Sequence, residues 1–149
     1  AHNQIEYLSQ NNFRNLSSLE NLDLSNNKIL KIERNTFGIR SLKIPNLRTL
    51  NLDSNFTFDL SSFTTSLTLL DLSNSTIQNI RSRNFQNLKH LRLNSLKMKS
   101  ISFFQQNLIP ALIELDLSRN NLSNLNLSQT FSRLEKLLFL NLSQVGLES

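Results

Sequence analysis

The residues best suited to chemistry in this sequence are basic side chains that gather in one acid-free stretch. Positions 72 to 113 contain no Asp or Glu but hold six Lys and Arg, whereas the whole 149-residue chain has a net charge of +5. Cations gathered on one surface attract phosphate groups or acidic protein surfaces. The residues predicted to make such contacts are Arg81, Arg83, Lys89, His90, Arg92, Lys97 and Lys99.

Catalytic chemistry has little support in the sequence. The chain has no Cys, two His and two Gly, which argues against thiol chemistry, Cys-based zinc sites and Gly-rich phosphate loops. Asp23, Asp71 and Asp116 recur at one phase of the repeat described below, but Asn51 and Arg92 fall between them, so they form no adjacent carboxylate pair. The sequence therefore predicts no enzyme active site, no cofactor and no metal site.

Asn-x-Ser/Thr sequons are a further candidate chemistry, because they accept N-linked glycans in secreted proteins. They occur at Asn15, Asn55, Asn74, Asn121, Asn126 and Asn141. Their number is close to chance for so Asn- and Ser-rich a chain, so it supports secretion only weakly. Asn15, Asn74 and Asn121 are the predicted acceptors, since Asn55 is expected to be structural and Asn141 to point from a strand.

An internal repeat predicts the elements that position these side chains. The pattern Leu-x-x-Leu-x-Leu occurs six times, and successive copies start 28, 20, 21, 24 and 25 residues apart. The copies start at Leu19, Leu47, Leu67, Leu88, Leu112 and Leu137, after a partial repeat that begins near Asn3. Within each copy, two leucines flank one residue, which is the period-2 pattern of a short strand.

One such strand cannot bury its apolar face, whereas stacked strands about 4.8 Å apart form a parallel sheet over a continuous leucine core. The central leucines are expected to form one column: Leu22, Leu50, Leu70, Leu91, Leu115 and Leu140. Phe side chains recurring about ten residues past each turn are expected to stack on the opposite, convex side. They are Phe13, Phe37, Phe85 and Phe131, with Phe63 and Phe104 as looser matches.

A polar slot three residues after each copy is expected to close the turn, because an Asn amide there can bond loop backbone. The slot residues are Asn27, Asn55, Ser75, Leu96, Asn120 and Val145. An apolar slot removes those bonds, at about 1–3 kcal/mol if the backbone groups stay buried. We predict that the solenoid bends or loosens near Leu96; the alternative is ordinary drift in a tolerant repeat.

The strand register also predicts ion pairs on the concave face. Arg92 should lie about 5 Å from Asp71 on one side and Asp116 on the other, and His90 should neighbour Glu114. Such exposed pairs contribute well under about 1 kcal/mol each. The remaining loop cations, Arg81, Arg83, Lys97 and Lys99, have no predicted partner. They can be solvated surface charge, a protein interface, or a site for nucleic acid or another polyanion.

The repeated spelling resembles that of leucine-rich repeat proteins over essentially the whole chain. The uneven spacing and the apolar slots resemble Toll-like receptor ectodomains more than regular arrays. The resemblance implies an α/β-type repeat solenoid: a curved horseshoe segment with a parallel concave β-sheet, mostly irregular convex loops and little helix. Residues 1–149 would form a single array of six strand segments plus a partial first repeat, an uncapped fragment of a longer solenoid.

The function that follows is non-catalytic recognition of a ligand or protein by a receptor ectodomain, in innate-immune pattern recognition. Its partner would be a protein ligand or a second receptor chain, or a polyanion such as nucleic acid. No stretch reaches the roughly 18 apolar residues of a membrane span, so no direct membrane contact by this segment is expected. The location would be the extracellular or endosomal-lumenal part of a membrane receptor. The alternatives are an extracellular adhesion or matrix-binding module and an intracellular scaffold.

Overall fold

The computed structural model describes residues 3–9, 11–33, 36, 49–51, 66–75, 85–101, 104, 109–123 and 126–146. The elements are β1 (Tyr7–Leu8), β2 (Asn21–Asp23), β3 (Lys31–Ile32), β4 (Thr49–Asn51), β5 (Leu69–Asp71), β6 (His90–Arg92), β7 (Glu114–Asp116), α2 (Leu127–Thr130) and β8 (Phe139–Asn141). Each strand of the main sheet is the middle of one leucine pattern, so the predicted strand positions are confirmed.

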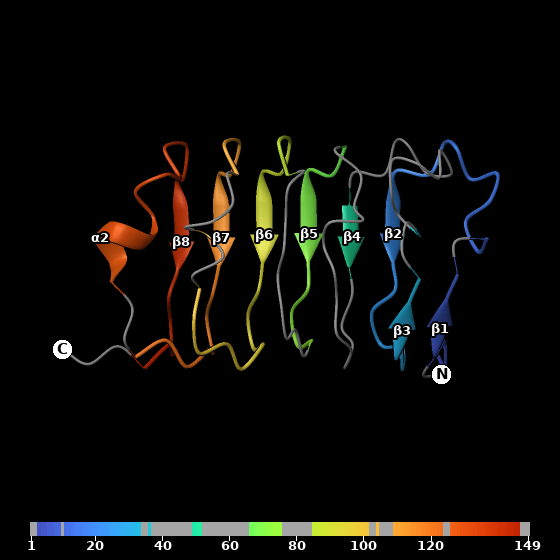
Figure 1. Ribbon diagram of the computed structural model, residues 1–149, viewed down its shortest axis with the longest axis horizontal. Coiled ribbons are helices and arrows are strands. Elements are labelled where there is room, and N and C mark those ends of the chain that lie inside the picture. The colour runs from blue at the N-terminus through green and yellow to red at the C-terminus, as the bar shows by residue number, and fades with distance from the viewer. Residues whose placement is uncertain are drawn as a thin grey trace.

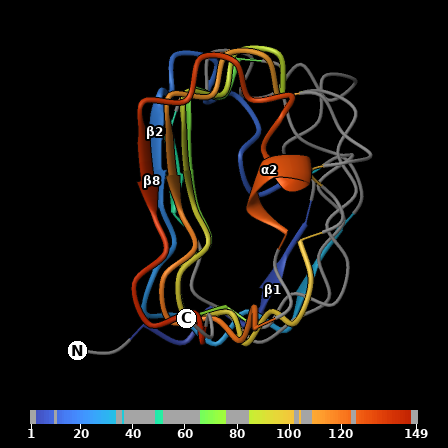
Figure 2. The ribbon, with the colours of Figure 1, turned by 90° about the vertical axis from the view of Figure 1, so that its left-hand side faces the viewer.

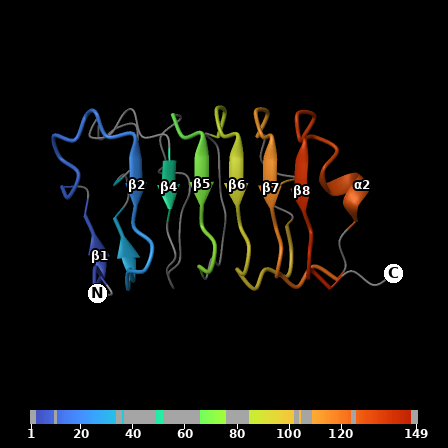
Figure 3. The ribbon, with the colours of Figure 1, turned by 180° about the vertical axis from the view of Figure 1, so that it is seen from behind.

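Six strands form one parallel sheet in the order β2-β4-β5-β6-β7-β8, and they lie side by side in Figures 1 and 3. The central leucines face one another across every strand pair, as predicted. The paired residues run Leu22, Leu50, Leu70, Leu91, Leu115 and Leu140. Because the strands follow one another in the chain and all run the same way, the chain makes one turn of a solenoid between successive strands.

The leucine core is tightest in the middle of the solenoid and open at its end. Leu70, Leu91 and Leu115 are almost completely buried, because a strand covers each on both sides. Leu140 on the terminal strand β8 is 39% exposed. Burial of a leucine is thus set by its neighbours in the stack and not by its own repeat, as expected for a structure in which each repeat contacts only adjacent ones.

Where the structure describes the side opposite the sheet, two short elements appear that the sequence did not predict. β1 and β3 pair in parallel as a separate two-stranded sheet, and α2 forms one four-residue turn. Viewed along the solenoid in Figure 2, β2 and β8 lie on one side, and α2 and β1 lie across from them. The small helix agrees with the expectation of little helix in repeats of this length.

Phenylalanines pack on this convex side, as predicted. Phe13, Phe85 and Phe104 are buried, and the Phe104 and Phe131 rings meet edge to face with centroids 6.1 Å apart. Phe104 is therefore a full member of the packing and not a loose match. Phe37 and Phe63 lie outside the described residues.

The Asn slots fasten each coil to the one before it. The Asn120 side-chain oxygen accepts from the backbone N–H of Leu96 and Met98, at 3.1 and 3.0 Å. Its amide lies within donor distance of the Leu93, Leu117 and Ser118 carbonyls. Asn120 is buried, so one side chain satisfies backbone groups that neither sheet nor helix reaches. The inferred role of the slot amide is confirmed.

Asn27 repeats this arrangement near the other end of the solenoid. Its side-chain oxygen accepts from Ile5 N at 3.1 Å, and its amide donates to the Leu24 and Ser25 carbonyls. Asn27 is less deeply buried than Asn120, and it makes fewer contacts with the preceding coil. The slot Asn therefore serves the same purpose in repeats of different length.

The two apolar slots do not loosen the ladder. Leu96 and Val145 are buried, and the parallel pairing continues through β5, β6 and β7. Beyond the strands, Ser95 N donates to Ser118 O at 3.0 Å. The predicted loosening near Leu96 is therefore wrong: the Asn of the following repeat supplies hydrogen bonds to this turn.

A second left-handed residue marks each apolar slot. The residue just before the slot has positive φ in every repeat whose turn is described: Asn26, Asn74, Ser95, Arg119 and Gln144. After Leu96 and Val145, the next residue is left-handed too, at Lys97 (φ 56°) and Gly146 (φ 73°). At Val145 the turned backbone takes over the missing side chain, because Leu122 N donates to Val145 O at 2.8 Å. Ser, Lys, Arg and Gln hold these left-handed positions as well as Asn.

Candidate functional site

Acidic residues at the strand ends have a local structural task. The side-chain oxygens of Asp23, Asp71 and Asp116 each accept a hydrogen bond from the backbone N–H two residues later, at 2.9 Å. Asn141 does the same at 3.1 Å. This turn, built on an Asp or Asn side chain, closes the chain as it leaves the sheet. The recurring Asp/Asn-Leu-Ser spelling is the sequence signal that could have predicted this turn.

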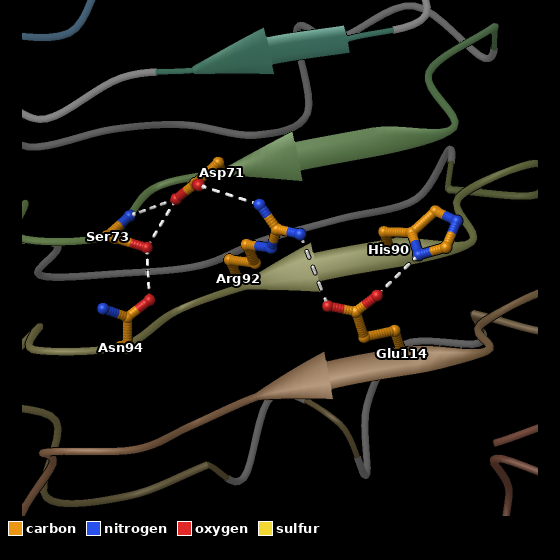
Figure 4. Close-up of polar contacts among 6 residues, drawn as sticks. All are labelled: Asp71, Ser73, His90, Arg92, Asn94 and Glu114. Carbon is orange, nitrogen blue, oxygen red and sulfur yellow. Dashed lines mark hydrogen bonds and ion pairs between the residues drawn. The ribbon is translucent and has the colours of Figure 1, made fainter. Parts of the chain in front are cut away.

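Four charged or titratable side chains from three strands meet at the centre of the concave face. The Arg92 guanidinium lies between two carboxylates, 3.8 Å from Asp71 on β5 and 3.5 Å from Glu114 on β7. The other Glu114 oxygen lies 3.0 Å from His90 Nδ1. Figure 4 shows this chain of contacts crossing the three strands. The side chains are partly exposed, so each pair stabilises the fold only slightly.

The network extends beyond the charged groups at the strand exit. The Ser73 hydroxyl contacts both the Asp71 carboxylate and the Asn94 side-chain oxygen, as Figure 4 shows. Asp71 is thereby held by Arg92, by its own turn and by Ser73 together. These shared contacts restrict the rotamers of the network, which lowers the conformational cost of presenting it to a partner.

Two of the predicted concave contacts are confirmed and one is wrong. Arg92 pairs with Asp71, and His90 contacts Glu114, as expected. On the other side, Arg92 reaches Glu114 and not Asp116, although Asp116 is its backbone partner in register. The Asp116 carboxylate instead accepts the hydrogen bond that closes its own turn. Asp71 accepts the same local bond through one oxygen and still contacts Arg92 through the other, so this bond alone does not decide which carboxylate Arg92 reaches.

An exposed aromatic ring adjoins this network. Phe139 on β8 is 66% exposed, and its neighbour in register on β7 is Glu114. Leu69 on β5 is the other apolar residue at this register position, and it is half-buried, so it exposes less of its side chain than Phe139 does. The apolar part of the described concave face is therefore concentrated at β8.

A second group of cations lies beyond the strand exits, on the turn edge of the solenoid. Lys97, Lys99 and Arg119 come from two consecutive repeats and line one open depression of about 610 Å³ with Asn120, Asn121 and Gln144. All three cations are exposed. None of the described residues that line the depression is a carboxylate, and the described part of the chain gives these three cations no ion pair. Sequence reasoning missed Arg119, because it follows the acid-free stretch in the chain.

The structure therefore does not gather the predicted contact residues into one patch. His90 and Arg92 belong to the concave network, and Lys97 and Lys99 belong to the turn edge. Lys89 is exposed just before β6 begins, so it lies at the opposite end of that strand from Lys97. Arg81 and Arg83 lie outside the described residues. Whether any of these residues contacts a ligand stays a prediction.

Comparisons with known proteins agree with this architecture. A family model described as leucine rich repeat matches residues 1–56. A solved structure, the leucine-rich repeat domain of APL1B, superposes with a TM-score of 0.74 at 24% identity, covering 95% of this chain and 40% of that one. Tsukushi from Gallus gallus is 36% identical over 135 residues, which are 87% of this chain and 35% of that protein.

The chain has the leucine-rich repeat fold. Two further relatives are epiphycan from Homo sapiens, 29% identical over 140 residues, and leucine-rich repeat-containing G-protein coupled receptor 5 from Rattus norvegicus, 34% identical over 113 residues. They match 93% and 72% of this chain. The chain spans 42% of epiphycan and 12% of the receptor, so the resemblance concerns the repeats and not the whole proteins.

The predicted glycan acceptors of this leucine-rich repeat chain sit on its surface. Asn15, Asn74 and Asn121 are exposed, but so are the sequon residues Asn126 and Asn141, so exposure does not separate the two groups. Asn121 also lines the depression on the turn edge. Asn55 lies outside the described residues.

The remaining titratable contacts offer no catalytic or metal geometry in the described segments. No group of three His, Asp or Glu side chains there could hold a metal ion. On the convex side, the Tyr7 hydroxyl donates to Glu33; this bond, with some desolvation and the nearby negative charge, raises the pKa of Tyr7. No helix found among the described residues is both long and apolar enough to cross a bilayer.

Proposed function

We propose that this protein is a non-catalytic recognition domain that binds a protein ligand on the concave face of β5 to β8. The supporting observation is the exposed Phe139 ring next to Glu114, which together with Asp71 holds Arg92 in place. Aromatic and Arg side chains supply most of the binding energy in protein interfaces, especially where they are held rigidly.

Charge indicates which surface would fit. The concave strands described here carry four acids, Asp23, Asp71, Glu114 and Asp116, against one Arg. The face is therefore acidic around its aromatic end, although the sequence stretch containing Arg92 is basic. The ligand we propose is a protein surface with basic side chains around an apolar group that packs on Phe139.

The test is a binding screen against purified secreted and membrane-ectodomain proteins, followed by variants of each binder's contact surface. Phe139→Ala is expected to weaken a concave-face binder at least tenfold, since it removes the central apolar contact. Leu30→Ala is the matched control, because Leu30 is 64% exposed in the loop that leads from β2 to β3, outside the main sheet. Binders that lose affinity with Leu30→Ala but not with Phe139→Ala would overturn the concave assignment.

We further propose an extracellular location, as part of a receptor ectodomain. One relative is by its name a G-protein coupled receptor with leucine-rich repeats, which supports a receptor role. The Toll-like and innate-immune form of the proposal rests only on the uneven repeat lengths and the apolar slots at Leu96 and Val145. An adhesion or matrix module is the alternative within the same location, and an intracellular scaffold is the alternative outside it.

Glycan mass spectrometry of the protein released by secreting cells separates the two locations. We expect glycan on Asn15, Asn74 and Asn121 of the secreted full chain. Asn→Gln variants at the same positions serve as controls and should each remove one glycan mass. Secreted protein without glycan at all three positions would contradict this part of the proposal.

A further inference from the structure

We propose that the depression on the turn edge binds sulfated oligosaccharide, with Lys97, Lys99 and Arg119 as the sulfate contacts. The site is separate from the concave face, so it does not depend on the protein-ligand proposal. It also differs from the broad basic stretch visible in the sequence, because it adds Arg119 and leaves out Lys89, His90 and Arg92.

The cations of this site are available to bind an anion, unlike the paired Arg92 on the concave face. Lys97, Lys99 and Arg119 are exposed, and the lining residues that the structure describes include no Asp or Glu. The concave Arg92, in contrast, is already shared between two carboxylates. An anion approaching the turn edge therefore gains charge-assisted hydrogen bonds without displacing an internal partner.

The backbone that carries these side chains is fixed from both sides. Met98 lies between Lys97 and Lys99; its N–H donates to the Asn120 side chain at 3.0 Å, and its carbonyl accepts from Asn121 N at 2.9 Å. Arg119 N donates to Ser143 O at 2.9 Å. Three consecutive coils are thus cross-linked beneath the three cations, so little backbone ordering is left to oppose binding.

Left-handed backbone lets neighbouring turns present their side chains together. Lys97, Arg119 and Gln144 all line the depression, and all have φ between 56° and 58°. Arg119 and Gln144 share the position before the slot, whereas Lys97 is the additional left-handed residue after the apolar Leu96. The apolar slot at Leu96 therefore brings an extra cation to the turn edge. The left-handed backbone at Lys97 is strained, because residues other than Gly and Asn rarely adopt it.

The lining favours a sulfated sugar over a nucleic acid. No aromatic side chain is among the described residues that line the depression, so those residues offer bases no stacking surface. Gln144 instead offers an amide that can bond sugar hydroxyls. A volume of about 610 Å³ is within the usual range of small-molecule sites and exceeds what a single inorganic anion needs.

The experiment measures affinity of the full chain, produced without glycosylation because Asn121 is both a sequon and part of the lining. The probe is a heparin-derived hexasaccharide at physiological salt. The variant Lys97→Gln/Lys99→Gln/Arg119→Gln is expected to bind at least tenfold more weakly. The control Arg14→Gln/Lys28→Gln/Lys136→Gln removes the same charge from exposed sites elsewhere and should change affinity less than twofold.

A second triple variant tests for misfolding and for charge together. Lys97→Arg/Lys99→Arg/Arg119→Lys keeps the cations and should retain binding within about threefold, with affinity that falls as salt rises. Equal losses in the turn-edge and control variants would mean binding by net charge alone and would overturn the site. Tighter binding of a single-stranded polynucleotide than of the hexasaccharide, lost in the same variant, would overturn the ligand class.

Discussion

Among the described residues, basic side chains are paired with carboxylates at the concave centre but lie unpaired together on the turn edge. Arg92 lies between Asp71 and Glu114, whereas Lys97, five residues later, joins Lys99 and Arg119 around a depression whose described lining holds no acid. In a parallel sheet each strand residue has neighbours about 4.8 Å away on both sides, so a strand cation meets whatever the adjacent repeats place there. Turn residues meet only neighbouring turns, and these turns are rich in neutral amides.

This difference teaches that charge along the chain is a poor guide to charge on a solenoid surface. The acid-free stretch from 72 to 113 contains members of both regions. The acids that neutralise Arg92 lie just outside it, at both ends, and are brought in by the stacking of repeats. The same stacking brings Arg119 to Lys97 and Lys99. The relevant neighbours are therefore one repeat away, not adjacent in sequence.

The largest expected effect comes from the residue on which the turn edge rests. Asn120→Ala should lower the free energy of unfolding by about 3 kcal/mol, because it leaves the Leu96 and Met98 N–H groups and their facing carbonyls without partners. Urea denaturation of both proteins, followed by circular dichroism, measures this.

Asn121→Ala is the matched control, since that side chain is exposed and its backbone bond to Met98 is kept. It should change the unfolding free energy by less than about 0.5 kcal/mol. If both alanine variants proved equally mild, the turn edge would not be the rigid region described above.

The next effect compares a paired cation with an unpaired one. Arg92→Met should cost about 1 kcal/mol of stability at low salt, because two partly exposed carboxylates lose their shared partner. Lys99→Gln should have an effect near zero, or stabilise slightly by reducing repulsion within the depression.

Varying the salt concentration separates the Arg92 and Lys99 variants further. Denaturation midpoints recorded from low salt to about 1 M should show the Arg92→Met penalty shrinking, since screening weakens ion pairs. The Lys99→Gln protein should stay within about 0.5 kcal/mol of the parent throughout. A penalty for Lys99→Gln as large as that for Arg92→Met would mean that the two regions do not differ in pairing.

The fold could be predicted from the sequence because each repeat carries its own complete pattern. The spacing of Leu88, Leu91 and Leu93 determines which residues face inward, and every copy repeats it, so the register and the column of central leucines follow. The slot Asn and the convex Phe positions follow for the same reason. Each depends on where a residue falls within one turn of the chain.

The sites could not be predicted to the same degree, because they depend on side-chain reach between repeats of unequal length. Only the tertiary structure decided that Arg92 reaches Glu114 while Asp116 closes its own turn, and that Leu96 is served by Asn120 from the next coil. It likewise placed Arg119 with Lys97 and Lys99. The sequence by itself determined which side of the solenoid each residue occupies, because burial of leucine dominates the folding energy. Contacts between polar groups differ by about 1 kcal/mol or less, so only the packed structure selects among them.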